Sequence, residues 1–352
     1  MKYYCNPINV NYRYQFILET NSQIPSVSRE AADPSLVYYQ GKYYMFASMT
    51  LGVWVSEDLV VWKNHRFERR VGLWPAGFDS DGELFCNQRY GDWPMVVEDG
   101  KMDPWRNPQW YLLSYGKIVT ASSYQEDKTP DLAVDENVQT WWRAAKAEEG
   151  EWLQVDLGSC KKVYGVQINF ADDRIDLPIP GDLSGEQMDR YIEVVDHVTR
   201  WFLEGSKDGV HYEMIEDKSQ VDTDLPHDFI VLEGGKEFRY IKLTILEVPY
   251  HQPACISGIR IFGKGDGKKA QMPEFQVVRT GDLDMMVIIN PQENVVGYNI
   301  LWGIAPYKLY HSYMIFDTKQ KIGALVKGEK YYVRVDAFNE NGITEGTIQK
   351  TN

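Results

Sequence analysis

The chain has 352 residues, with 37 basic and 51 acidic side chains and a net charge of −14 at neutral pH. This acidity disfavours nucleic acid and anionic membranes as partners, because both repel a negatively charged surface. Hydrophobic residues make up 43% of the sequence and charged residues 25%, which excludes a disordered or fibrous chain. A chain of this length is expected to fold as about two or three domains.

Aromatic residues reach 13% of the sequence. Aromatic faces suit sugar rings, and they also fill the cores of β-proteins, so the composition permits carbohydrate binding. No stretch reaches the ~18 apolar residues of a membrane span. Residues 1–7 contain no apolar core of a secretory signal, so we expect a cytoplasmic protein.

The four cysteines, at positions 5, 86, 160 and 255, are widely scattered. They form no CxxC pair and no cluster with histidine, so a zinc site is not expected. In a reducing cytoplasm we expect buried free thiols.

Short runs of Val, Ile, Tyr, Phe and Trp alternate with Gly, Asp, Asn and Pro along the chain, which is typical of an all-β protein. One segment departs from this β-strand pattern. Residues 184–200 begin with a capping signal and carry apolar side chains at helical spacing, so the sequence predicts a helix there. Two connectors rich in Pro or Gly divide the chain into segments 1–116, 117–265 and 272–352.

The first segment begins with a predicted hairpin of residues 32–39 and 42–48 around a Gln40-Gly41 turn, followed by a strand within 52–56. An Asp33-Pro34 strand, a Tyr-Tyr strand and the motif S-x-D-L-x-x-W ending at Trp62 resemble the first propeller blade of glycoside hydrolase family 43. That family comprises five-bladed β-propellers acting on xylan, arabinan and related glycans. The resemblance implies that Asp33 occupies the general-base position.

Hydrolysis with inversion needs a second carboxyl group, ~6.5–9.5 Å from the first, to protonate the leaving oxygen. The family's acid motif is not found in the sequence, and residues 64–87 resemble the family's final blade instead. About 116 residues cannot supply five blades of ~40–45 residues each. Three replacement acids remain, none in a recognisable context: Glu30, Glu68 and Glu83. We expect a remnant of a propeller whose open strand edges invite pairing with a second copy.

The middle segment carries five signatures in order: a strand from Lys117, a loop at 135–140, a strand at 150–158, a turn at 204–212 and closing strands ending at 263. The series is similar to the discoidin, or coagulation factor 5/8 type C, domain, which includes carbohydrate-binding module family 32. The resemblance implies a jelly-roll β-sandwich with Trp142, Trp152 and Leu157 as scaffold residues.

The discoidin resemblance also implies a structural calcium site. The family often holds calcium in the loop that corresponds to 135–140, where Asp135, Asn137 and Thr140 offer the oxygen ligands that hard cations prefer. The family often caps this ion with a glutamate before the last strand. This chain has Gly258 at that place. No other cofactor is expected.

Sugar binding in such modules uses aromatic and polar side chains of loops at one rim. Three residues are candidates for that role here: Tyr124, Trp141 and Arg143. The insert at 172–199 departs from the family pattern. We expect it to pack against a neighbouring domain, where it could cover the rim.

In the last segment, strands are expected at 274–279, 284–290 and 297–302. Residues 325–339 resemble the tyrosine-corner strand of a fibronectin type III domain, with Tyr331 at the corner. The alternation predicts that Val333, Val335 and Ala337 are buried against an opposite sheet. Such units usually act as spacers or protein contacts.

Three functions remain open. The first is a carbohydrate-binding protein derived from a family 43 glycosidase, catalytically incompetent, with a plant-type or other glycan of the xylan or arabinan class as its partner. The second is an active inverting glycosidase of the xylosidase or arabinofuranosidase type, with Asp33 as general base. The third is a module for protein adhesion.

Overall fold

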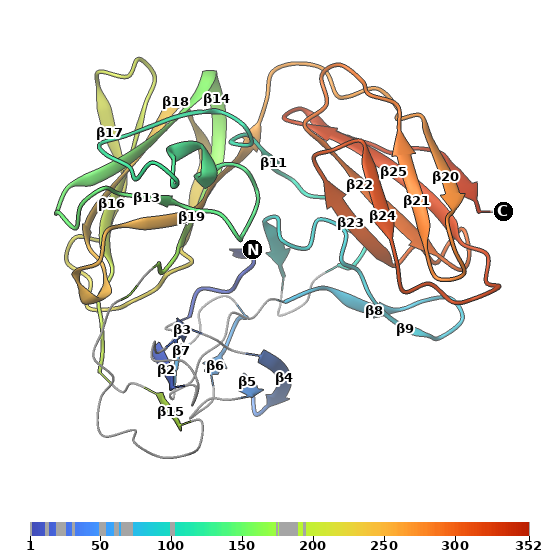
Figure 1. Ribbon diagram of the computed structural model, residues 1–352, viewed down its shortest axis with the longest axis horizontal. Helices are drawn as coiled ribbons and strands as arrows, with labels where there is room; N and C mark the ends of the chain where they lie inside the picture. Colours follow the sequence, from blue (N-terminus) through green and yellow to red (C-terminus); the bar gives the residue numbers. More distant parts are fainter. Residues whose placement is uncertain are drawn as a thin grey trace. The chain divides into compact units, whose positions relative to one another are not determined.

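A computed structural model describes most of the chain: residues 2–10, 14–18, 26–29, 32–48, 54–59, 63–64, 73–98, 103–173, 175, 189–192 and 195–351. Within these ranges the only helices are two short 3₁₀ helices, η1 (Pro130–Ala133) and η2 (Pro249–His251), and strands dominate (Figure 1). The all-β prediction is therefore confirmed. None of the described helices is long and apolar enough to cross a membrane.

Two compact units make up the chain. The first contains Met1–Gly72, Val97–Gly100 and Ser114–Ile261, and the second contains Leu73–Val96, Lys101–Leu113 and Phe262–Asn352. Strand β19 (Cys255–Lys264) runs from the first unit into the second. Residues 73–113, which the sequence assigns to the first segment, thus group mainly with the C-terminal residues.

The main sheet of the first unit has the strand order β19-β14-β18-β16-β17, with β12 on β14 and β13 on β19. Its strands are β12 (Ile118–Ala121), β13 (Trp142–Arg143), β14 (Glu151–Phe170), β16 (Arg200–Ser206), β17 (Tyr212–Asp217), β18 (Phe229–Glu247) and β19. The two long strands β14 and β18 pair antiparallel with register shifts after Asp156 and Val163. Such irregularities bend paired strands, as the closure of a sandwich requires.

Alternating apolar residues build the core of this sheet. Leu153, Val155 and Leu157 on β14 are buried, whereas the side chains between them are half-buried. Trp142 is fully buried, which confirms it and Leu157 as scaffold residues. Trp152 is half-buried and lies under the ammonium group of Lys242, 5.2 Å from the ring centroid.

The predicted helix at 184–200 is wrong where the structure describes the segment. Asp189–Ile192 form strand β15, which pairs antiparallel with β2 (Tyr14–Leu18), and β2 pairs with β3 (Ser26–Arg29). Residues 195–199 are not helical, and 184–188 lie outside the described residues. Cross-strand pairing with β2 outweighs the weak local preference for helix. The sequence predicts that the insert packs against a neighbouring domain; its strand β15 pairs with β2 of segment 1–116, and both strands belong to the same compact unit.

The predicted N-terminal hairpin is confirmed. Strands β4 (Ala32–Tyr39), β5 (Lys42–Ser48), β6 (Trp54–Ser56) and β7 (Lys63–Asn64) form an antiparallel sheet in that order. The turn residues Gln40 and Gly41 both have positive φ, which matches a tight hairpin turn. Two further strands of the chain are β1 (Lys2–Tyr4) and β10 (Met95–Val97).

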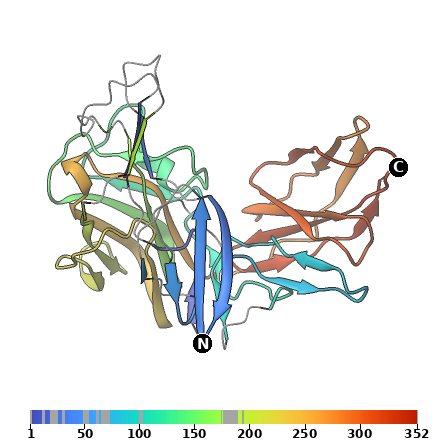
Figure 2. The ribbon, with the colours of Figure 1, turned by 90° about the horizontal axis from the view of Figure 1, so that it is seen from below.

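In the second unit, β8 (Ala76–Phe78) and β9 (Leu84–Cys86) form a hairpin, and β11 (Tyr111–Leu112) pairs with the end of β19. The C-terminal part has two sheets, seen as two layers in Figure 2. One contains β20 (Phe275–Arg279), β21 (Met285–Ile289) and β24 (Lys319–Ile322). The other contains β22 (Gly297–Gly303), β23 (His311–Ile315), β25 (Tyr332–Asn339), β26 (Gly342–Thr344) and β27 (Ile348–Lys350).

The core between these two sheets confirms the predicted burial pattern. Val333, Val335 and Ala337 on β25 are fully buried together with Met285 and Ile300. The backbone N–H of Val326 donates to the Tyr331 hydroxyl at 3.1 Å, which gives the contact expected at a tyrosine corner.

All four cysteines are free thiols, as predicted. Their predicted burial holds for Cys5 and Cys255 and is wrong for Cys86 and Cys160, which are exposed.

Candidate functional site

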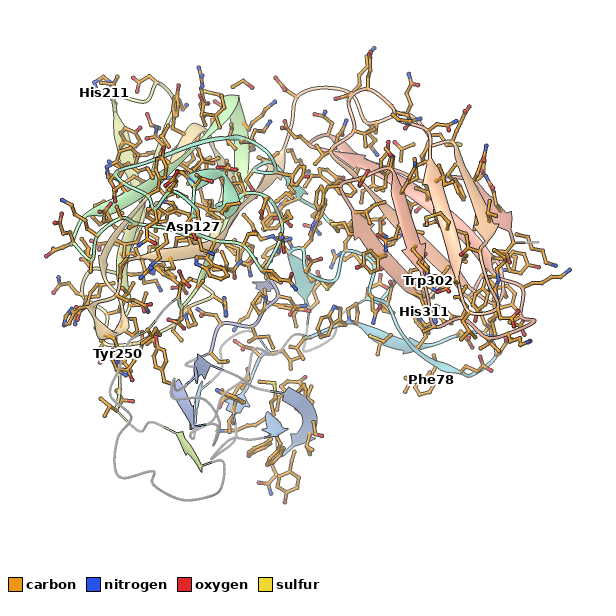
Figure 3. The ribbon with its side chains drawn as sticks, viewed as in Figure 1. Phe78, Asp127, His211, Tyr250, Trp302 and His311 are labelled. Atoms are coloured by element: carbon orange, nitrogen blue, oxygen red, sulfur yellow. The ribbon has the colours of Figure 1, made fainter. Side chains whose placement is uncertain are left out.

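The three predicted sugar-binding residues lie on two neighbouring segments of the first unit. The backbone N–H of Gln125 donates to the Arg143 carbonyl at 3.1 Å, and the Arg143 N–H donates to the Lys128 carbonyl at 3.2 Å. These bonds fix the loop that follows β12 against β13. Figure 3 marks this loop by Asp127. We call Tyr124, Gln125, Lys128, Trp141, Arg143 and Asp173 the rim cluster.

Tyr124 presents the accessible aromatic ring of the rim cluster, since its side chain is 53% exposed. Trp141 is half-buried, and the Lys128 ammonium lies 3.5 Å from its ring centroid. This cation–π contact covers one face of the indole. The Trp141 Nε1 atom is buried and has no hydrogen-bond partner among the residues that the structure describes. The two aromatic residues therefore differ: Tyr124 is open to a ligand, and Trp141 is packed under a lysine.

The buried Arg143 side chain stabilises the loop. It is 8% exposed. Its Nη1 donates to Gln125 Oε1 at 3.2 Å and lies 3.6 Å from Asp173 Oδ2. On β13 it is opposite Cys255, whose thiol pKa is raised to about 12 by burial, with a smaller opposing effect of Arg143. A thiol whose pKa is raised in this way stays protonated at neutral pH.

Sequence reasoning did not single out Gln125, Lys128 or Asp173. Their roles depend on the pairing of segments that are distant in the chain, as the Gln125–Arg143 and Arg143–Asp173 contacts show, which join residues 18 and 30 positions apart. The polar run from Gln125 to Lys128 indicates a loop, and no feature of that run indicates which side chains face Trp141.

The loop expected to hold calcium is closed by its own hydrogen bonds. Asp135 Oδ1 accepts from the Asn137 N–H at 2.9 Å, and its Oδ2 accepts from the Thr140 hydroxyl at 2.6 Å. Asn137 Oδ1 accepts from the Gln139 N–H at 3.1 Å. These oxygens point to donors in the loop rather than to a shared centre, whereas calcium takes 6–8 oxygen ligands in general.

At the place of the family's capping glutamate, the last strand has Gly258, which offers no side-chain ligand. A Cβ atom at Gly258 would lie 3.1 Å from Asn169 Nδ2, so this place is filled by an amide. Within the described ranges, no group of three or more His, Cys, Asp or Glu side chains is arranged to hold a metal ion. The residues present do not fit a calcium ion.

The predicted general base lies on the edge strand β4. Asp33 falls in a register irregularity between the pairs Ala32–Ser48 and Ser35–Phe46, and its side chain lies outside the described residues. Of the replacement acids, Glu30 and Glu68 also lie outside the described residues. Glu83 accepts a hydrogen bond from the Lys308 ammonium at 2.7 Å in the second unit.

The first unit thus contains an antiparallel β-sandwich of long bent strands, with a loop beside β13 that exposes Tyr124 to solvent. Residues 118–179, which include β12, β13 and β14, match the F5/8 type C domain family. The predicted discoidin-type domain in the middle segment is supported by this match. A comparison with curated proteins gives no match.

Several solved structures are similar to part of the chain. Chitosan-binding module 1 of a chitosanase/glucanase from Paenibacillus sp. IK-5 is 17% identical over 44% of this chain and 99% of its own, with a TM-score of 0.34. CpGH89CBM32-4 of Clostridium perfringens, in complex with GlcNAc-α-1,4-galactose, is 14% identical over 45% and 97%, with a TM-score of 0.34. The family 32 module of Clostridium perfringens NanJ, in complex with galactose, is 15% identical over 44% and 98%, with a TM-score of 0.34.

Proposed function

We propose that this chain is a glycan-binding protein whose discoidin-type domain holds a sugar at the rim cluster. The observation that carries the proposal is the exposed Tyr124 ring on a loop that buried Arg143 fixes in place. The F5/8 type C match to residues 118–179 supports it, because it covers both segments of the cluster.

The chemistry of the rim cluster suits a sugar. The apolar face of a pyranose packs on an aromatic ring, while its hydroxyl groups need polar partners at the ring's edge. Gln125 and Lys128 follow Tyr124 in the same loop, one and four residues later, and carry an amide and an ammonium group. Because the loop is already fixed by backbone hydrogen bonds, binding requires little ordering of the protein.

A glycan array with the full chain tests this function, followed by titration of the best ligand. We expect Tyr124→Ala to weaken binding at least about tenfold, a loss of about 1.4 kcal/mol. Tyr313→Ala is the matched control, since Tyr313 on β23 is 51% exposed and lies in the other unit. Binding that survives Tyr124→Ala, or an array without any hit, would remove the rim cluster from consideration.

We further propose that the glycan belongs to the xylan or arabinan class and that the chain does not hydrolyse it. The family 43 resemblance of residues 32–87 supports the glycan class. The expectation that the chain does not hydrolyse the glycan is supported by the sequence, which contains no recognisable acid partner for Asp33. Aryl xylosides and arabinofuranosides provide the test. If the unmodified chain hydrolyses these substrates and Asp33→Ala abolishes the hydrolysis, the alternative is established instead: an inverting glycosidase with Asp33 as base.

Self-association through strand edges and protein adhesion remain predictions. Among the described strands, β4 lies at the edge of its sheet, and it exposes the uncharged run from Leu36 to Tyr39. Such an edge is a template for pairing with another chain. Light scattering of the purified chain over a concentration range measures the oligomeric state, and a mass that stays monomeric would contradict the prediction.

A further inference from the structure

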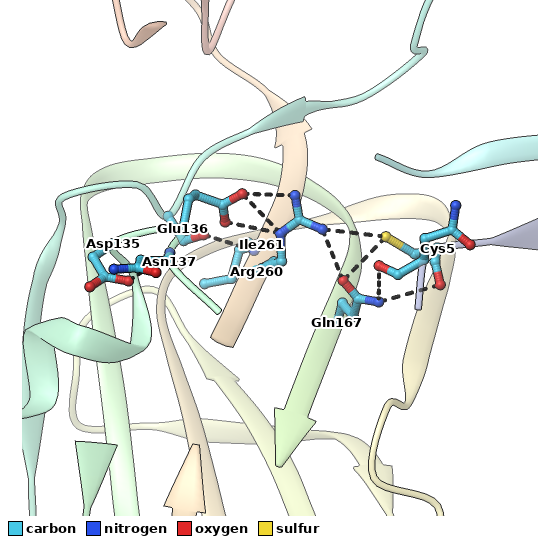
Figure 4. Close-up of polar contacts among 9 residues, drawn as sticks. Cys5, Asp135, Glu136, Asn137, Gln167, Arg260 and Ile261 are labelled. Carbon is cyan, nitrogen blue, oxygen red and sulfur yellow. Dashed lines mark hydrogen bonds and ion pairs between the residues drawn. The ribbon is translucent and has the colours of Figure 1, made fainter. Parts of the chain in front are cut away.

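A buried arginine lies beside the loop at 135–140. Arg260 is on β19, and its side chain is 9% exposed. Its Nε donates to Glu136 Oε1 and Oε2 at 2.9 and 3.1 Å, and its Nη2 donates to Oε2 at 2.8 Å. Figure 4 shows the guanidinium between Glu136 on one side and Gln167 and Cys5 on the other. The Glu136 carboxylate is equally buried, with 8% exposure.

The same guanidinium connects three segments of the first unit. Its Nη1 donates to Gln167 Oε1 on β14 at 3.1 Å and lies 3.9 Å from the Cys5 sulfur. The amide nitrogen of Gln167 in turn donates to the carbonyls of Cys5 and Asn6 at 3.3 and 3.0 Å. One positive charge therefore joins the loop, the sheet and the N-terminal segment.

Glu136 needs such a partner for two reasons. Its φ of +57° places it in the left-handed region, which is unfavourable for a residue with a Cβ unless the surroundings hold it there. Its carboxylate is also withdrawn from water, which is unfavourable unless a bonded counter-charge compensates. The planar guanidinium meets both carboxylate oxygens at once, which a point charge on a lysine cannot do.

We infer that the Arg260 guanidinium is the resident cation of the 135–140 loop and that the loop folds without a metal ion. The loop carboxylate nearest the sheet is already neutralised, and the Asp135 and Asn137 side chains are bonded within the loop. A divalent ion placed there would be repelled by the neighbouring guanidinium. The amide of Asn169 fills the space beside Gly258, from which a further carboxylate would have to approach.

The first test uses the unmodified chain. Its melting temperature is measured in excess EDTA and in millimolar CaCl2, and calcium binding is measured by titration calorimetry. We expect equal melting temperatures and no saturable heat of binding. A melting temperature that calcium raises and EDTA lowers, together with stoichiometric binding that Asp135→Ala removes, would overturn the inference.

The second test removes the proposed cation. Arg260→Met leaves Glu136 buried without its counter-charge, so we expect the melting temperature to fall by about 10 °C. Arg239→Met is the matched control: Arg239 also binds a carboxylate through two hydrogen bonds, to Asp156 at 2.8 Å each, but its side chain is 38% exposed. That variant should lose about 2 °C or less.

Hydrogen exchange shows which segments lose protection when the Arg260–Glu136 contact is broken. It also provides a test if Arg260→Met is too unstable for melting measurements. In the milder Glu136→Gln variant, exchange should accelerate in peptides covering 135–140, whereas Arg239→Met leaves that peptide unchanged. In Arg260→Met, peptides covering residues 2–10 should also lose protection, because Gln167 is no longer held beside Cys5. Unchanged exchange at 135–140 in both Arg260→Met and Glu136→Gln would contradict a cation role for Arg260.

Discussion

Replacement of Asp228 by Asn should stabilise the protein at neutral pH and not at acid pH. Asp228 is 9% exposed, and its Oδ1 accepts a hydrogen bond from Asn9 Nδ2 at 2.6 Å. Burial raises the pKa of this carboxyl from 3.8 to about 6, an effect that Glu216 reinforces and that Lys218 and the Asn9 bond oppose. The folded protein therefore holds the proton more tightly than the unfolded chain.

The sign and size of the effect follow from this difference in pKa. The stability that the neutral carboxyl contributes is fully present below pH 3.8 and is lost as the pH rises to about 6. A difference of about 2 pKa units corresponds to about 3 kcal/mol at 1.36 kcal/mol per unit. Asp228→Asn removes the ionisation and keeps an oxygen for Asn9. We expect it to gain up to about 3 kcal/mol at pH 7.5 and almost nothing at pH 4.

Urea denaturation followed by tryptophan fluorescence at both pH values measures this gain. Asp156→Asn is a control for which we expect the opposite change in the free energy of unfolding at pH 7.5. The hydrogen bond from Arg239 lowers the pKa of Asp156, and burial opposes it, so the loss of that ionised carboxylate should destabilise the protein at pH 7.5. The reasoning is refuted if Asp228→Asn is no more stable than the unmodified chain at pH 7.5, or if its gain is the same at both pH values.

Three further substitutions test the packing in the two units. Tyr331→Phe should cost about 1 kcal/mol of unfolding free energy in urea, because the Val326 N–H loses its acceptor; an unchanged value would contradict the tyrosine-corner contact. Gly205→Ala should cost about 1–3 kcal/mol, since its Cβ would lie 2.4 Å from the Phe238 ring; a neutral result would mean that the ring can move. Lys308→Met should lower the melting temperature at pH 7, because the Lys308 ammonium lies 3.2, 2.7 and 2.7 Å from carboxylate oxygens of Asp79, Asp81 and Glu83; an unchanged melting temperature would exclude a stabilising charge effect.

Much of the fold was predictable from the sequence because its strands have a strict two-residue period. Val333, Val335 and Ala337 alternate with polar residues, and all three are buried between the C-terminal sheets. The Gln40-Gly41 turn could likewise be placed, since a turn with two positive φ angles favours glycine. These features depend on neighbours in the chain, so the sequence contains the information directly.

The predicted helix shows where such reasoning fails. Residues 184–200 have apolar side chains at helical spacing, yet Asp189–Ile192 pair with Tyr14–Leu18 in a β-ladder. The partner strand lies more than 170 residues earlier, and no local pattern reports its presence. A short amphipathic segment gains little from helix formation alone in water, so an available strand partner decides its structure.

The rim cluster shows the same limit for the proposed binding site. The sequence indicates Tyr124, Trp141 and Arg143 as one group of loop residues, but their burial separates them into different roles. Arg143 is held below the surface by Gln125 and Asp173, and the indole of Trp141 lies under Lys128. At the proposed sugar site, Tyr124 would meet the ligand first, because the other two side chains are already engaged with protein. Substitution of Arg143 should therefore weaken binding through a displaced loop, whereas substitution of Tyr124 removes the contact itself.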